Sequence, residues 1–111
     1  MNETPTQTYY LDIASGEIMM DPNWDWTFRL QATDDEIDLL REMLDEEYET
    51  DWETFNRAHV PFLEYHKSSP NDEYDDRMVY IYAMIYKLGD AEAKQHVEEM
   101  GILTVPLRNE E

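Results

Sequence analysis

The segment from Met78 to Leu88 is the longest apolar stretch of the chain, and the residues around it predict a helix. Acidic residues crowd the positions before it, Lys87 lies near its end and Gly89 follows, an order that suits the helix dipole and a helix C-terminus. A helix over 72–88 is about 25 Å long at about 1.5 Å per residue, which is too long for an ordinary strand. On a helical projection, most of the charged residues fall in one narrow sector, which contains Asp72, Glu73, Asp76, Tyr80, Ala83 and Lys87. We therefore expect the other elements to enclose this helix on most sides.

Alternation of apolar and polar residues predicts strands in the amino-terminal third. Apolar residues occupy every second position from Tyr9 to Ile13, a turn at Gly16 follows, and an apolar run returns over 17–20. The most regular alternation runs from Trp24 to Ala32. We expect a three-stranded antiparallel meander whose strands cover 8–13, 17–20 and 24–32.

Three further segments have the spacing of helices. Thr33 and Glu36 form a capping box at the start of a helix over 34–48. Another helix covers 51–66 and is kinked near Pro61, because the residue before a proline disfavours the α conformation. The last helix, over 91–100, starts after Asp90 and ends at Gly101.

The expected fold class is α+β, with the meander packed against four helices (34–48, 51–66, 72–88 and 91–100). A chain of 111 residues has the length of one small domain. We place that domain at 8–107, between a flexible amino-terminal segment (1–7) and a frayed end (108–111).

The charge balance is the strongest anomaly of the composition, with 27 acidic and 8 basic residues and a formal net charge of −19. Such a charge repels nucleic acids and anionic membranes and attracts basic protein surfaces. The chain has no cysteine and begins without the basic and apolar regions of a signal peptide, so we expect a cytoplasmic location. Self-repulsion opposes a homodimer and an open sheet edge favours one, so monomer and homodimer both remain open.

Acidic residues recur at three- and four-residue steps from position 35 to 49, away from the apolar side of the expected helix. We call this set the acidic ridge: Asp35, Asp38, Glu42, Asp45 and Glu49. Like charges at this spacing cost about 0.2–0.5 kcal/mol per pair, so stability alone does not favour them. We interpret the chain as a non-enzymatic interaction module that presents this ridge to a basic partner. A DNA-mimic inhibitor of a nucleic-acid-binding protein is one alternative, and acidity that only maintains solubility is another.

A small metal-dependent enzyme is the third alternative. Its candidate ligands are His59, Glu64 and His66, but two histidines seven residues apart do not match the usual metal-binding spacings. We interpret each histidine as structural. No catalytic residue, metal site or cofactor is therefore assigned from the sequence.

Overall fold

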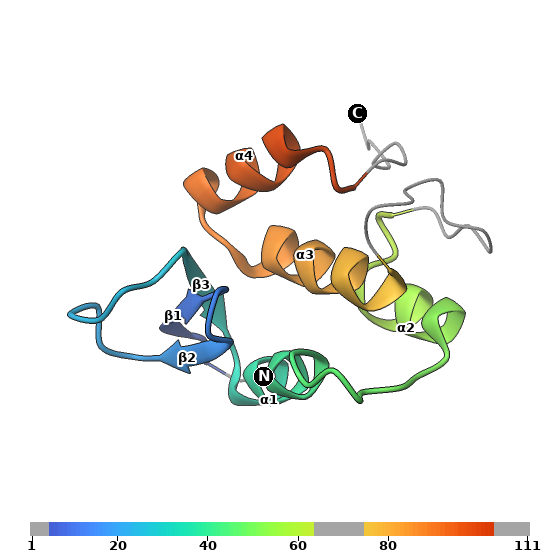
Figure 1. The fold of residues 1–111 in the computed structure, drawn as a ribbon, viewed down its shortest axis with the longest axis horizontal. Helices are drawn as coiled ribbons and strands as arrows, with labels where there is room; N and C mark the ends of the chain where they lie inside the picture. Colours follow the sequence, from blue (N-terminus) through green and yellow to red (C-terminus); the bar gives the residue numbers. More distant parts are fainter. Residues whose placement is uncertain (1–4, 64–74, 104–111) are drawn as a thin grey trace.

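The fold is α+β, as the sequence predicts, in a computed structural model that describes residues 5–63 and 75–103. The strands are β1 (Gln7–Asp12), β2 (Glu17–Met19) and β3 (Phe28–Ala32). The helices are α1 (Asp34–Met43), α2 (Trp52–His59), α3 (Asp76–Leu88) and α4 (Ala91–Met100). The sheet lies beside one end of α3, and α1, α2 and α4 surround that helix (Figure 1).

The strand order corrects one part of the prediction. A meander places the second strand in the middle, whereas the observed antiparallel order is β2-β1-β3. The β1–β2 turn is tight, with Gly16 at φ 78° and its N–H donating to the Asp12 carbonyl at 2.8 Å. The chain then crosses back to the other edge of β1. This order puts β3 next to the helices, where Leu30 forms a β-bridge with Gly89 after α3.

Strand β3 begins at Phe28 rather than at Trp24. Phe28 pairs with Leu11, and the Thr27 N–H still donates to the Leu11 carbonyl at 2.7 Å. The ladder ends there, because the Ile13 N–H donates to the Thr27 hydroxyl (3.2 Å) in place of a backbone carbonyl. Trp24 is therefore 62% exposed instead of buried. Trp26 lies against Tyr10 on the outer side of the sheet, with ring centroids 5.0 Å apart.

Helix α1 starts as predicted and ends earlier. The capping box is present, because the Thr33 hydroxyl accepts from the Glu36 N–H and the Glu36 carboxylate accepts from the Thr33 N–H. The helix ends at Met43 and not at 48. A guanidinium nitrogen of Arg77 donates to the Met43 carbonyl at 2.8 Å and so satisfies one of the free acceptors at this end.

Helix α2 ends at His59, before Pro61, so the expected kink is a break. The buried Asn56 amide holds the chain after the break, donating to the carbonyls of Leu63 (2.9 Å) and Val60 (3.4 Å). Residues 64–66 of the expected helix lie outside the described residues, as do 72–74 before α3 and the chain ends 1–4 and 104–111.

Helix α3 is the centre of the core, as predicted. Six consecutive residues from Tyr80 to Ile85 are buried, and so is Leu88. Tyr80 and Ala83, which the helical projection places in the same sector as most of the charged residues, are also buried because α2 covers that side. At the other end, the Lys94 amine donates to the carbonyls of Tyr86 (2.6 Å) and Gly89 (3.1 Å), which fixes the turn into α4.

Candidate functional site

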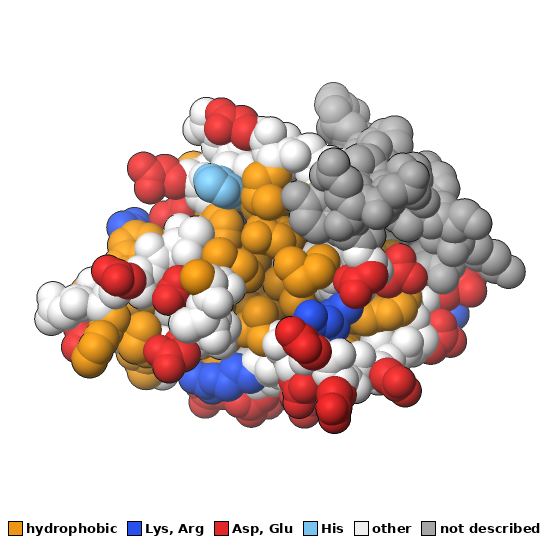
Figure 2. Space-filling view, in the orientation of Figure 1, with side chains coloured by type: hydrophobic (Ala, Val, Ile, Leu, Met, Phe, Trp, Pro, Cys, Tyr) orange, Lys and Arg blue, Asp and Glu red, His pale blue; other side chains and the backbone are white. Residues whose placement is uncertain are grey.

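The five residues of the acidic ridge are all exposed. Asp35, Asp38 and Glu42 lie on the solvent side of α1, and Asp45 and Glu49 follow in the non-helical connection 44–51. The ridge is therefore helical over three of its members only. Figure 2 shows carboxylates along the lower edge of the molecule, around a band of hydrophobic side chains at the centre of this face.

Few cations neutralise the ridge. Within the described part of the chain, ion pairs join Arg29 to Asp90, Arg41 to Asp38 and Arg57 to Glu53. Only the Arg41–Asp38 pair involves the ridge, and it is long (3.7 Å) and solvent-exposed. Exposed pairs of this kind contribute little, so the ridge keeps nearly all its negative charge.

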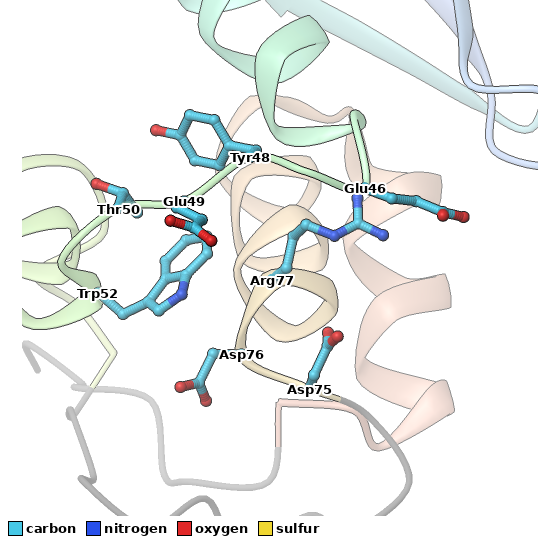
Figure 3. A pocket seen from close by; sticks show the side chains of 8 residues that line it. All are labelled: Glu46, Tyr48, Glu49, Thr50, Trp52, Asp75, Asp76 and Arg77. Carbon is cyan, nitrogen blue, oxygen red and sulfur yellow. The ribbon is translucent and has the colours of Figure 1, made fainter.

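A hollow of about 520 Å³ lies beside the end of the ridge, where the connection 44–51 passes the start of α3 (Figure 3). Its lining includes four carboxylates and two aromatic rings: Glu46, Glu49, Asp75, Asp76, Tyr48 and Trp52. None of these carboxylates forms an ion pair with a described residue. We call this hollow the acidic–aromatic pocket.

The aromatic wall of this pocket is held by stacking. The Trp52 ring lies parallel to Tyr80 of α3, with centroids 5.1 Å apart and an interplanar angle of 6°. Tyr48 meets Trp52 edge-on at 6.0 Å. Asp51 caps α2 by accepting from the N–H groups of Glu53 and Thr54, which fixes the position of Trp52 as the first helical residue.

A second hollow, of about 240 Å³, lies between the β1–β2 turn and α3. Its lining mixes four apolar side chains, Ile13, Leu44, Met78 and Ile81, with Ala14, Ser15 and Gly16 of the turn and with the charged Glu46 and Arg77. Glu46 and Arg77 line both hollows and so form the boundary between them. We call the second hollow the apolar pocket, and the two together the groove.

The histidines give no metal centre among the described residues, where no group of three or more histidine or carboxylate side chains is placed to hold an ion. His59 is half-buried at the end of α2, against Phe55 (4.7 Å between ring centroids). Burial, and then the positive charge of Lys87, hold the pKa of His59 below its usual 6.5. Glu64 and His66, the other two candidate ligands, lie outside the described residues, so the metal-dependent alternative stays a prediction.

Two tyrosines have perturbed acidity, and both are explained by contacts between elements. The Tyr9 hydroxyl donates to Asp34 at 2.9 Å and the Tyr86 hydroxyl to Glu98 at 2.8 Å, and these hydrogen bonds raise the pKa of each phenol. Neither ring lines the acidic–aromatic pocket. These shifts belong to packing rather than to a reactive site.

The sequence predicts that the residues of the ridge are exposed, as the structure shows, but it does not predict the groove. Asp75 and Asp76 read as ordinary anions before a helix, and Trp52 reads as part of a buried helix face. The signal that joins them is spatial, because the pocket forms only where the connection 44–51 meets the start of α3. No periodic pattern in the sequence predicts that these two segments lie together.

Comparisons with known proteins give no match among protein-family models, curated proteins or solved structures. Within the described ranges, no helix has the length and apolar character needed to cross a membrane. The functional conclusion therefore depends on the surface of this chain alone.

Proposed function

We propose that this protein is a non-enzymatic interaction module whose acidic ridge binds a basic surface on a partner protein. The observation that carries the proposal is an exposed row of five carboxylates, only one of which is paired with a cation in the described structure. A surface optimised for stability would intersperse lysine or arginine among these residues. An unpaired row instead favours a partner that supplies the missing positive charge.

Long-range attraction is the physical basis of such binding. A net charge of −19 accelerates encounter with a basic surface, and the unpaired ridge gives that encounter a preferred orientation. Salt weakens the attraction, because the Debye length falls from about 10 Å at 0.1 M to about 3 Å at 1 M. The association rate should therefore depend on salt more steeply than the dissociation rate does.

The test compares two variants that lose the same number of charges. The ridge variant carries Asp35→Asn, Asp38→Asn, Glu42→Gln and Asp45→Asn, and it keeps Glu49 because that residue also lines the acidic–aromatic pocket. The control variant carries Glu17→Gln, Asp21→Asn, Asp25→Asn and Glu92→Gln, all at exposed positions outside the ridge. Each immobilised protein is incubated with cell lysate at low and at high salt, and the retained proteins are identified by mass spectrometry.

We expect the wild-type protein and the control variant to retain the same basic protein at low salt and to release it at high salt. The ridge variant should lose it. Equal loss from both variants would mean that only total charge matters, and this result would overturn the role of the ridge. A retained protein that binds DNA, and that DNA displaces, would instead identify the narrower DNA-mimic function.

A further inference from the structure

We propose that the groove is the specific part of this interface, and that it binds a partner segment that carries one apolar and one cationic side chain. This inference rests on the proposed function and specifies which chemistry the partner presents. The apolar side chain fills the apolar pocket, and the cationic side chain, an arginine or a lysine, enters the acidic–aromatic pocket.

The acidic–aromatic pocket fits a cation through its rings as well as its charges. Tyr80 stacks on Trp52, Tyr48 and Phe55 meet the same ring at an angle, and the half-buried Trp52 lines the hollow together with Tyr48. A guanidinium or ammonium group over an aromatic ring gains a cation–π interaction, and arginine makes it more often than lysine. Figure 3 shows the Glu49 carboxylate beside the Trp52 ring, so a cation at the ring also meets a carboxylate, whereas the Asp76 side chain points away from the ring.

Arg77 does not neutralise this pocket by forming an ion pair with a described residue. One of its guanidinium nitrogens is used for the Met43 carbonyl at the end of α1. The lining therefore carries four carboxylates and one guanidinium, a formal charge of −3, and the Asp75 carboxylate also accepts from the Met78 N–H at the start of α3. A partner's cation would supply the charge that the hollow lacks.

The apolar pocket supplies an independent reason for a protein partner. Leu44 and Met78 are only partly buried, and with Ile13 they border a hollow large enough for an aliphatic side chain. Simple attraction between opposite charges needs no such hollow. Because Glu46 and Arg77 separate the two pockets, one short segment of chain can reach both.

Charge complementarity selects the occupant. Nucleic acid is disfavoured because its phosphates would meet four carboxylates, and a second copy of this chain brings another net charge of −19. A basic, amphipathic segment of another protein satisfies both pockets. Such segments dock into grooves through a few spaced side chains, and this is a recurring mode of peptide recognition.

The experiment uses a set of capped peptides in which alanines of varied number separate one leucine from one arginine. Control peptides replace the leucine by alanine or the arginine by glutamine. Each peptide is titrated into the isotope-labelled full chain, and NMR follows the indole N–H of Trp52 and the backbone N–H of Met78. We expect the peptide with one particular leucine–arginine spacing to shift both signals and to bind about tenfold more tightly than either of its control peptides.

Two charge-reversal variants distinguish the effect of the groove on binding from the effect of total charge. Glu46→Lys places a cation at the boundary of both pockets, whereas Glu47→Lys makes the same change one residue away, at an exposed position that lines neither pocket. We expect Glu46→Lys to weaken peptide binding about tenfold more than Glu47→Lys does. The chemical shifts of the free variants verify that each one folds.

Three results would overturn the inference: no peptide shifts the Trp52 and Met78 signals, the two reversals weaken binding equally, or the wild-type chain dimerises and Glu46→Lys dissociates the dimer. The last result would identify a second copy as the occupant. Failure of the proposed function is distinguishable, because the ridge variant would then retain the same lysate proteins as its control. If the groove still bound peptide in that case, the inference about the groove would hold independently of the ridge.

Discussion

Replacement of Asn56 by alanine tests how α2 is joined to the core. Asn56 is 5% exposed, and its amide nitrogen contacts the carbonyls of Leu63 (2.9 Å) and Val60 (3.4 Å) and the hydroxyl of Tyr80 (3.3 Å). This one side chain therefore fastens the end of α2, the segment after Pro61 and the central helix to one another. Alanine removes all three contacts.

The magnitude follows from the acceptor that Asn56→Ala leaves without its donor. A buried polar group without a partner costs about 1–3 kcal/mol. This cost applies to the Leu63 carbonyl, whereas the Val60 carbonyl still accepts from the Leu63 N–H at 3.0 Å. A protein of this size has a free energy of unfolding of about 5–15 kcal/mol, so the change is a large fraction of the total.

Urea denaturation followed by circular dichroism measures this change. We expect Asn56→Ala to lower the midpoint by about 0.5–1.5 M urea, at an m value of about 2 kcal/mol per M. Gln95→Ala, at an exposed position on α4, is the matched control and should change stability by less than about 0.5 kcal/mol. Equal midpoints for the two variants would refute the assignment of these hydrogen bonds to the stability of the core.

Two further predictions concern the ends of α2 and α3. Gly89→Ala would place a Cβ atom 2.5 Å from the Cβ of Ala93 and 2.7 Å from the carbonyl oxygen of Ile85, so we expect a loss of about 1–3 kcal/mol, measured by thermal unfolding and contradicted by an unchanged or raised Tm. Lys87→Gln removes the cation beside His59 and should raise its pKa toward 6.5, measured by NMR titration, and an unchanged titration midpoint would contradict this. The unfolded chain protonates His59 more readily than the folded protein does, so the free energy of unfolding falls as pH drops from about 6.5 through the folded pKa, and Lys87→Gln should reduce that loss.

Local patterns predicted the elements and failed at their ends. The alternation from Trp24 to Ala32 correctly indicates a strand, but it does not show that pairing starts at Phe28, where the Thr27 hydroxyl takes the Ile13 N–H and ends the backbone ladder. In the same way, apolar spacing continues past Met43 although the helix does not. The Arg77 contact at that end joins residues 34 positions apart, and spacing along the sequence carries no information about it.

The candidate site was predictable where it depends on one segment and unpredictable where it joins two. The exposure of Asp35, Asp38 and Glu42 follows from their positions opposite the buried side of α1. The acidic–aromatic pocket needs the connection 44–51 and the start of α3 to meet, and that meeting depends on the packing of the whole domain. The order of strands in the sheet was missed for the same reason.

The two edges of the sheet differ in how readily a strand from another chain could pair with them. The turn between α3 and α4 already occupies the β3 side, where the Asp90 N–H donates to the Arg29 carbonyl at 3.2 Å. On the other side β2 has only three residues, and Arg41 donates to the Ile18 carbonyl at 3.3 Å. A neighbouring chain therefore finds a very short template with one acceptor already taken, which limits the growth of fibres through this edge.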